Sequence, residues 1–566
     1  MININFKHFY GELTRLSAKK KERLIELYTD YSKSNDEVFY ENKLFKFTIE
    51  GVKHHFEELM NFIIYIPKNK IYDEIIKVSL PIEDYLLRHF YEPISSWSDN
   101  IFNKNKEKRD QFTVFIQEPS QIVVKRNGVI YDNNVECFLI KLVVQIPLMS
   151  GGKRIDGKKA IMCFKKLFSI IERLILNINN SELKKSIVLY DNQQQIRDFL
   201  IKNEFVCFIG NGSILPRNED SDKKNINSIP FLSPKENEIT IELKNGEKIS
   251  GMGIKKGICV IIGDGYSGKS TLINAIESGI YNHCLNDGRE YILTDTTAIM
   301  CNSEEGRSIN KADMSFFFKR LPGKSLVSSY CSNHASGSVS QSCNILEALN
   351  LKSNLILIDE DKSAVNFMYK DEAMKKIIPN SSIVTLMERL TTLKEITSFI
   401  IVVGSLSDFM KYADTIIVMK DFKAEIFHYD LKAIDELKEI PIKKEKIVNC
   451  KFRVFFKIDV IDNKMFIYDD LFIDVSSITS VISKHQISFL QYAVKLCLSY
   501  SKQESIPLFS LVSNAKSYIL NKECISITNI INENTSMFFE DVRNIDIQLA
   551  LLRLKNKGQL DINLFK

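Results

Sequence analysis

The pattern of hydrophobic and polar positions predicts a chain that mixes strands with helices. In the first third, residues 136–146 form an apolar run typical of a buried strand, and apolar residues recur at helical spacing over residues 160–178. Helices are also expected over residues 13–31 and 82–88. The alternating segments EITIEL and EKISGMGI, within residues 238–254, predict an antiparallel pair of strands.

The end of the chain shows the same mixture. Strands are predicted at residues 452–460 and 464–468, and helices at residues 476–498 and 542–555. These elements follow the lysine-rich segment KEIPIKKEKIVNC, which is typical of a linker.

Turn-rich and charged segments divide the chain into three predicted domains. The polar stretch at residues 210–230 is typical of a solvated loop. Boundaries are expected near residues 185 and 446. They give an N-terminal α+β domain (1–185), a central α/β domain (186–445) and a smaller C-terminal α+β domain (446–566).

Composition excludes several classes of protein. Of 566 residues, 45% are hydrophobic and 26% are charged, and the formal net charge is 76 − 71 = +5. These values exclude a disordered acidic chain and a histone-like basic protein. The eleven cysteines are scattered singly, which favours free thiols over a disulfide framework or a zinc module.

Targeting signals are also missing from the pattern. No apolar run reaches the ~18 residues of a membrane span, and the first residues lack the apolar core of a signal peptide. We therefore expect a soluble intracellular protein with no membrane partner, located in the cytoplasm or in the mitochondrial matrix.

A phosphate-binding loop is the strongest signal in the chain. The β-branched run at residues 258–262 leads into GDGYSGKS, which matches G-x-x-x-x-G-K-[ST] without a mismatch, and a helical pattern follows. Such a loop points N–H groups at phosphates, its lysine reaches the β- and γ-phosphates, and its serine ligates Mg²⁺. A chance glycine-rich turn explains the order of strand, motif and helix less well. The predicted ATP-binding residues are Gly263, Asp264, Gly265, Tyr266, Ser267, Gly268, Lys269, Ser270 and Thr271.

Acidic residues end a second predicted strand. The segment LILIDED places Asp359 and Glu360 after four apolar residues. Asp359 is predicted to hold Mg²⁺ together with Ser270, and Glu360 to polarise the attacking water as the catalytic residue. A solvated strand end is the alternative, and the P-loop upstream favours the catalytic interpretation.

A serine–glycine turn lies between these two motifs. The segment ASGSVSQ is similar to the signature L-S-G-G-Q-x-Q of ABC-class ATPases, and residues 363–366 resemble the D-loop S-A-L-D, with asparagine for aspartate. N–H groups and a hydroxyl at a helix start form an anion site. Since such turns are common, the order P-loop, signature, acidic strand and D-loop carries the argument. The predicted signature residues, which contact a nucleotide held by another chain, are Ser336, Gly337, Ser338 and Gln341.

Longer segments resemble one known family. VIIGDGYSGKSTLINAIESGIYNHCLNDGREYILTD, NSEEGRSI, ASGSVSQSCNILEAL and LILIDEDKSAVNFMYKD are similar to the soluble "predicted ATPase of the ABC class" family. That family includes ATPases associated with mitochondrial RNA editing in kinetoplastids. Upstream, PIEDYLLRHF, IPLMSGGKRIDGKKA and FVCFIGNGSILPR are also similar, as are FIDVSSITSVISKHQ and FEDVRNIDIQLALLRLKN downstream. The resemblance therefore covers nearly the whole chain.

The resemblance implies a fold and an activity. The fold is α/β, with one ABC-type P-loop nucleotide-binding core flanked by N-terminal and C-terminal accessory domains. Mg²⁺ and ATP are the implied cofactors, bound between two protomers of a homodimer. Hydrolysis to ADP and phosphate would be coupled to closure of the accessory domains. A transporter subunit is disfavoured because over half of the chain lies outside the core.

Departures from the ABC pattern keep a second function open. After a predicted strand at residues 399–403 the chain has GSLSD, where many ABC ATPases carry a switch histidine. This favours the alternative of an ATP-gated binding scaffold with negligible turnover. No Q-loop glutamine is evident, and Glu304 and Glu305 are expected to sense the γ-phosphate or Mg²⁺ in that region. Phe231 is a candidate to stack on adenine, although a core phenylalanine fits the same position.

Basic clusters raise the question of RNA as a partner. Cations gather in the glycine-rich turn at residues 151–159 and also at residues 19–23, 104–109 and 443–446. Such groups suit sequence-independent phosphate contacts, but ordinary solvated loops explain each cluster as well. The prediction of RNA binding therefore depends mainly on the resemblance. Its candidate contacts are Lys153, Arg154, Lys158 and Lys159.

Overall fold

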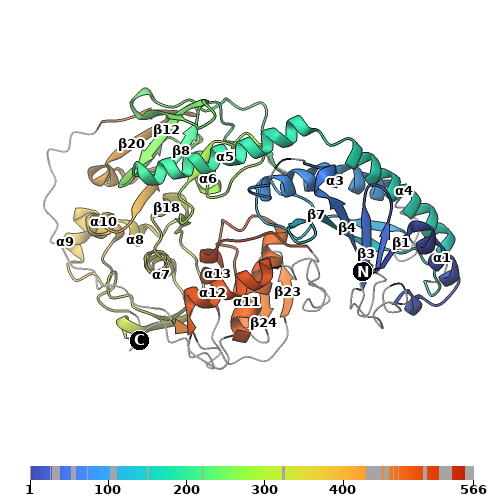
Figure 1. The fold of residues 1–566 in the computed structure, drawn as a ribbon. Helices are drawn as coiled ribbons and strands as arrows, with labels where there is room; N and C mark the ends of the chain where they lie inside the picture. The colour runs from blue at the N-terminus through green and yellow to red at the C-terminus, as the bar shows by residue number, and fades with distance from the viewer. Residues whose placement is uncertain are drawn as a thin grey trace. The chain divides into compact units, whose positions relative to one another are not determined.

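The computed structural model groups the chain into two compact units (Figure 1). Unit 1 comprises Met1–Val188 and Tyr518–Asp541, and unit 2 comprises Leu189–Ser517 and Val542–Lys566. Both units combine helices with strands, as the predicted α/β class requires. The structure describes residues 2–25, 27, 38–51, 59–72, 74, 76–101, 111–149, 152–218, 221–321, 326–428, 449–450, 458–462, 465–468, 471–500, 506–521 and 538–554.

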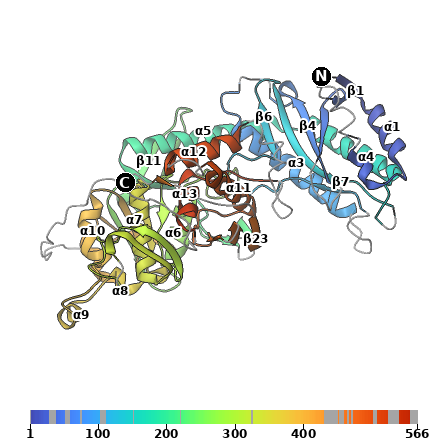
Figure 2. The same cartoon turned by 90° about the horizontal axis from the view of Figure 1, so that it is seen from below.

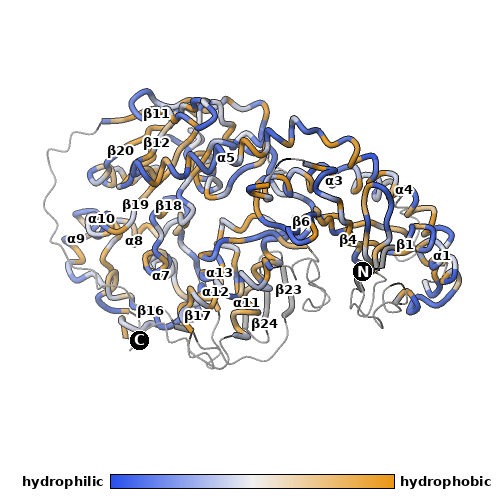
Figure 3. Tube along the Cα trace, in the orientation of Figure 1, coloured by the Kyte–Doolittle hydropathy of each residue, from blue (hydrophilic) through white to orange (hydrophobic). Residues whose placement is uncertain are grey.

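Unit 1 is built on a seven-stranded sheet with the order β1-β2-β3-β4-β7-β5, in which β6 also pairs with β7. The β1 and β2 pair is parallel and the others are antiparallel. β7 is buried at every position, which explains why its residues are apolar except for the buried Lys141 and Gln145. Hydrophobic colour follows strands such as β4 in Figure 3. The strands are β1 (Ile2–Asn5), β2 (Val38–Glu41), β3 (Lys46–Gly51), β4 (Leu59–Pro67), β5 (Thr113–Phe115), β6 (Val129–Asp132) and β7 (Cys137–Gln145).

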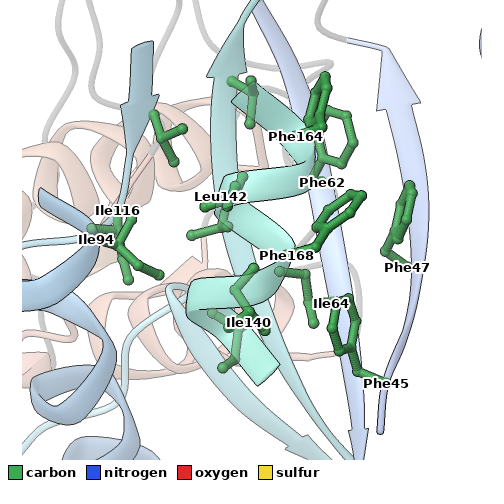
Figure 4. Packing of buried hydrophobic residues seen from close by; sticks show 14 of the residues in the cluster. Phe45, Phe47, Phe62, Ile64, Ile94, Ile116, Ile140, Leu142, Phe164 and Phe168 are labelled. Carbon is green, nitrogen blue, oxygen red and sulfur yellow. The ribbon is translucent and has the colours of Figure 1, made fainter. Parts of the chain in front are cut away.

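Three helices cover one face of this sheet and enclose an aromatic core. Alternate residues of β4 and β7 share one cluster with residues of the helices, as the two-residue period of a strand requires. Phe164 lies with its ring centroid 5.0 Å from that of Phe62, and Phe168 lies 5.0 Å from Phe47 (Figure 4). The helices are α1 (Phe6–Leu16), α3 (Leu80–Ile101) and α4 (Gly157–Leu176). The border with unit 2 lies in α5 (Asn180–Lys202).

A late segment of the chain also belongs to unit 1. Arg126 Nε lies 2.6 Å from Glu540 Oε1, and its Nη1 lies 2.5 Å from Asp84 Oδ1, with all three side chains buried. Described residues of the 446–566 region therefore contribute to both units. The three-domain division stays a prediction, because its border at residue 446 lies outside the described residues.

Unit 2 contains two larger sheets. In the six-stranded sheet every pair is parallel except β20 with β21. The four-stranded sheet is antiparallel, with the order β11-β12-β8-β14. The first contains, in order, β15 (Ile299–Met300), β18 (Leu355–Asp359), β19 (Ser398–Val402), β13 (Ile258–Gly263), β20 (Thr415–Lys420) and β21 (Lys423–Ile426). The second contains β8 (Phe205–Gly210), β11 (Glu238–Glu242), β12 (Lys248–Lys255) and β14 (Ile292–Thr294).

Helices and short hairpins complete unit 2, and α11 and α13 lie side by side in both cartoon views (Figures 1 and 2). The helices are α6 (Lys269–Ser278), α7 (Gly337–Asn350), α8 (Val365–Met368), α9 (Glu372–Ile377), α10 (Leu386–Lys394), α11 (Lys484–Tyr500) and α13 (Asn544–Leu552), with α12 (Leu508–Leu520) across a border between units. The remaining strands are β9 (Arg217–Asn218), β10 (Ser221–Lys224), β16 (Arg307–Ala312), β17 (Tyr330–Ala335), β22 (Asn449–Cys450), β23 (Ile458–Asp462), β24 (Met465–Tyr468), β25 (Leu471–Asp474) and β26 (Ile506–Pro507). Every helix within the described residues falls short of the length and apolar character that a membrane span requires.

Local pattern predicted many of these elements but misplaced some helix ends. The strands around the P-loop, the antiparallel β11 and β12 pair and α4 are confirmed. The helix predicted over residues 13–31 is interrupted after Leu16, because Ala18 has φ 62° and its N–H donates to Ile155 O, and a short 3₁₀ helix follows at Lys21–Ile25. The helix predicted from residue 476 begins only at Lys484.

Candidate nucleotide-binding site

Three adjacent parallel strands bring the predicted catalytic segments to one edge of the six-stranded sheet. β13 pairs with β19 and β19 with β18, so that Ile261, Val402 and Asp359 form one row across the sheet. Because parallel strands end at the same edge, the P-loop, the loop after β19 and Glu360 all emerge there. Open α/β sheets bind their ligands at such an edge.

The P-loop curls between β13 and α6. Its lysine folds into the loop, since Lys269 Nζ donates to the carbonyl oxygens of Gly263 at 2.6 Å and of Asp264 at 2.7 Å. Ser270 is exposed and Thr271 is half-buried in the first turn of α6, where helix N–H groups are free of intrahelical partners. The predicted ATP-binding residues therefore lie on one continuous loop and helix start.

Two features of the loop fit a bound phosphate chain. Gly263 has φ 153°, and a Cβ there would lie 2.5 Å from Met419 O, so only glycine allows this close approach. Ser267 is 8% exposed, and its Oγ has no hydrogen-bond partner within the described part of the chain. Buried hydroxyls in native proteins are nearly always hydrogen-bonded, so this one is available to a ligand oxygen or to water.

Asp359 ends β18 next to this loop. Burial raises the pKa of the Asp359 carboxyl, against the opposing effect of Lys362 and, more weakly, Lys269. Mg²⁺ is typically held by one or two protein oxygens together with phosphates and water. The exposed Ser270 hydroxyl and the Asp359 carboxylate therefore fit a Mg²⁺ ion that arrives with its nucleotide.

Glu360 is held by the loop that follows β19. Its Oε2 accepts hydrogen bonds from the backbone N–H groups of Gly404 (2.7 Å), Ser405 (3.1 Å) and Leu406 (3.4 Å), and the Ser405 hydroxyl donates to Oε1. Burial alone would raise the pKa of Glu360, but these donors lower it below its usual value. The segment without a switch histidine therefore still contacts the predicted catalytic carboxylate.

The predicted signature residues begin α7 and are bonded to the D-loop. Gln341 Nε2 donates to Ser363 Oγ at 2.8 Å, and its Oε1 accepts from Ala364 N at 2.8 Å. Ser338 Oγ donates to Asn366 Oδ1 at 2.6 Å. The segment that follows Glu360 is thus fixed to the signature helix, whereas Ser336 stays exposed at the start of that helix.

The two glutamates of NSEEGRSI also contact α7. Glu305 Oε2 accepts from the N–H of Gly337 at 2.8 Å, at the positive end of that helix. Glu304 Oε1 accepts from Asn344 at 2.9 Å and from Arg553 at 2.6 Å. Burial would raise the pKa of Glu304, but chiefly Arg553 lowers it to about 2. The sensing role predicted for this pair stays a prediction.

Sequence reasoning missed two groups, and for Phe231 the structure supports the core interpretation over the stacking one. Two of the residues that contact the site carry no local motif. They are Ser405 and Arg553, which follows α13 and is 249 positions from Glu304. The only local signal was a lone arginine in the apolar stretch LALLRLK and a small residue at the end of a strand. Phe231 is 3% exposed, so it is a core residue and its ring is not available to a base.

In unit 1 the structure joins two of the predicted basic clusters. Lys21 N donates to Lys153 O at 3.1 Å, and Lys20 and Arg154 form an antiparallel bridge. Lys158 is exposed and Lys159 half-buried at the start of α4. We call residues 19–23 and 153–159 together the paired basic segments. The clusters at residues 104–109 and 443–446 lie outside the described residues.

Comparison with known proteins identifies the family. Residues 179–452 match the model of the P-loop domain of ABC ATPases, and residues 52–177 match the model described as the N-terminal part of ATPases of the ABC class. The chain belongs to the ATPases of the ABC class. The predicted family and the predicted fold class are thereby confirmed, and the kinetoplastid resemblance stays a prediction.

One relative of this ABC-class chain is an uncharacterized protein of Methanocaldococcus jannaschii. It is 35% identical over 284 residues, which cover 48% of this chain and 63% of the relative.

Solved structures that match part of this chain include ATP-binding cassettes. They include cbiO1 from Clostridium perfringens, part of the ABC transporter complex cbiONQ, with 16% identity, a TM-score of 0.24 and coverage of 39% of this chain and 87% of that one. A cassette of an ABC transporter in its ADP conformation has 17% identity, a TM-score of 0.22 and coverage of 33% and 86%. A dimeric cassette in a post-hydrolysis state, bound to ADP and Pi, has 18% identity, a TM-score of 0.21 and coverage of 35% and 97%.

Replacement of Arg553 by methionine is expected to destabilise the protein. The Glu304 and Arg553 side chains are 12% and 6% exposed, and the change removes the arginine that bonds to this buried carboxylate and leaves only the weaker effect of Arg307. We expect the free energy of unfolding at pH 7 to fall by about 3–5 kcal/mol, measured by urea denaturation. Arg320→Met, which removes an exposed arginine of unit 2, is the control.

The same pair gives the stability a defined pH dependence. Because the folded pKa of Glu304 lies below its unfolded value, the pair contributes stability above pH ~4.3 that is lost as the pH falls toward 2. Arg553→Met should flatten this acid limb. The assignment would be contradicted if the free energies of unfolding of wild type and variant changed in parallel with pH between pH ~4.3 and about pH 2.

Proposed function

We propose that this chain is a Mg²⁺-dependent ATPase whose two nucleotide sites form between two copies of the chain. One observation carries the proposal: the P-loop, Asp359 and Glu360 emerge at one edge of a parallel sheet, beside the buried and unpaired hydroxyl of Ser267. In this arrangement the loop N–H groups and Lys269 bind the triphosphate. Bound Mg²⁺ would supply charge neutralisation at the phosphates, held by Ser270 and Asp359.

Glu360 is the residue that would activate water. It directly follows Asp359 at the edge where the P-loop emerges, so its carboxylate would lie near the γ-phosphate end of a nucleotide in the loop. A carboxylate in this position orients the attacking water and accepts its proton.

A second copy would complete the site through its signature. Ser336 is exposed at the start of α7, a fourteen-residue helix whose partial positive charge favours an anion. The bonds from Gln341 to the D-loop connect this helix start to Glu360 within the same chain. Closure of two chains on ATP would therefore complete both nucleotide sites at once and move the accessory domains.

Two substitutions test the shared site. Lys269→Ala removes the charge that binds the β- and γ-phosphates and should abolish ATP binding, measured by calorimetry. Glu360→Gln keeps the site but removes the base, and should trap an ATP-bound dimer, measured by analytical ultracentrifugation. Lys256→Ala removes an exposed lysine just before the amino end of β13, away from the loop, and is the matched control. The shared-site model would be wrong if neither substitution changed dimer formation.

The alternative function, an ATP-gated binding scaffold with negligible turnover, also has a structural observation in its favour. The carboxylate of Glu360 is engaged by four donors of the loop after β19, which lower its pKa and weaken it as a base. ATP would then act as a conformational ligand that holds two chains together around a partner.

Phosphate release separates the enzyme from the scaffold. We expect steady-state turnover in wild type that Glu360→Gln abolishes, with and without RNA. In Ser405→Ala the loss of one donor should raise the pKa of Glu360, so that the acid limb of the kcat profile moves to higher pH. Ser407→Ala, in the same loop, should leave the profile unchanged. ATP-dependent dimers without phosphate release would establish the scaffold function.

We further propose that the paired basic segments of unit 1 bind single-stranded RNA. Six of their cations, at positions 19, 20, 23, 153, 154 and 158, have exposed side chains, against the acids Glu22 and Asp156. Asp156 is occupied as the N-cap of α4, accepting from Lys159 N at 3.0 Å. Two clusters that are distant in sequence thus form one surface for phosphates.

A salt series tests the RNA surface. The double variant Lys153→Ala and Arg154→Ala should weaken binding to single-stranded RNA and reduce the slope of log K against log salt by about 1.4, for two lost phosphate contacts. Lys184→Ala with Lys185→Ala, exposed on α5 in the same unit, removes the same charge and should not change the slope. The RNA-binding proposal would be wrong if the wild-type protein showed no detectable affinity for single-stranded RNA at low salt.

A further inference from the structure

The turn between β20 and β21 places an aromatic ring against the P-loop. β20 pairs with β13 up to Gly263, which lies opposite Met419. Beyond this pair the N–H of Phe422 donates to Ser267 O at 3.1 Å. A Cβ built on Gly268 would lie 3.1 Å from Cδ1 of the Phe422 ring. The ring therefore contacts the glycine that closes the phosphate-binding loop.

The backbone at this turn is strained for a phenylalanine. Lys420 pairs with Lys423, so Asp421 and Phe422 form a two-residue turn, with φ of 47° and 63°. Such turns favour aspartate or asparagine followed by glycine, because both positions need positive φ. A bulky residue in this conformation is an outlier, and such strain concentrates at ligand sites.

Packing does not explain the choice of residue. The side chain of Phe422 is 56% exposed, although it is apolar and its backbone is strained. By contrast Met419, two positions before the turn, is buried. The fold thus holds an exposed ring at the P-loop at a conformational cost.

The strand order indicates which part of a nucleotide would meet this ring. β18 and β19 lie on one side of β13 and carry Asp359, Glu360 and the loop that contacts it, whereas β20 and β21 lie on the other side. A triphosphate whose γ-phosphate faces Glu360 directs its α-phosphate and nucleoside away from β18, toward β20. Phe422 lies on that side.

We propose that Phe422 stacks on the purine base of the nucleotide bound in the P-loop. The inference rests on the proposed function and names the residue that binds the nucleoside end. A phenylalanine ring offers a stacking face without hydrogen-bonding groups, so it adds affinity for any purine nucleoside triphosphate and does not distinguish adenine from guanine. Stacking on aromatic side chains tolerates every base for the same reason.

The test compares two ligands on the full-length chain by calorimetry: Mg²⁺-ATP and Mg²⁺-tripolyphosphate, which has the phosphates but no base. Phe422→Gly should weaken ATP binding about tenfold and leave tripolyphosphate binding unchanged. Because glycine suits the turn, the variant should fold with an unchanged or raised thermal midpoint. Phe422→Tyr should retain ATP affinity. Phe427→Ala, at the other end of β21 and also exposed, is the control and should bind both ligands normally.

Other outcomes would overturn the assignment. Equal weakening of both ligands by Phe422→Gly would mean that the ring only shapes the loop. Unchanged ATP binding in Phe422→Gly, with a base-dependent loss in Tyr266→Ala, would assign stacking to the fully exposed Tyr266 instead. Wild type that binds neither ligand would overturn the proposed function itself, and is thus distinguishable from failure of the Phe422 assignment.

Discussion

The parallel pairing of β13, β19 and β18 is the constraint on which the candidate site depends. The residues of β18 and β19 are all buried, so these strands are fixed by packing as well as by hydrogen bonds. Their register puts Ile261, Val402 and Asp359 in one row, and every functional segment begins one or two residues later. A slip by one residue would turn each side chain to the opposite face and separate the loop from the acids.

Contacts continue from this row to Arg553. The D-loop after Glu360 is bonded to α7 through Gln341, and α7 is bonded to Glu304 through Asn344. Glu304 in turn pairs with Arg553. All of these groups lie within unit 2, so a continuous series of hydrogen bonds and ion pairs joins the segment after Glu360 to Arg553. The described residues 542–554 therefore pack in the same unit as the P-loop.

Sequence predicted what depends on local order and missed what depends on distant pairing. The P-loop strand and helix, β7 and α4 follow from apolar periodicity and a specific motif, and the structure has them. The first helix ends early because Ala18 bonds to Ile155, which no local pattern contains. The Glu304 pair with Arg553 and the contacts of Glu360 with Gly404–Leu406 likewise join segments far apart in the chain. The roles of the site residues themselves stay predictions.

The loop at Gly404–Leu406 changes how the absent histidine is interpreted. Without a histidine, this loop still offers three backbone N–H groups and one side-chain hydroxyl to the carboxylate of Glu360. Donors of this kind stabilise the charged form, so they keep Glu360 ionised and at the same time make it a weaker base. Under the proposed function, turnover would require the carboxylate to exchange some of these donors for water when two chains close on the nucleotide. The difference between an enzyme and a scaffold reduces to whether closure releases one carboxylate from one loop.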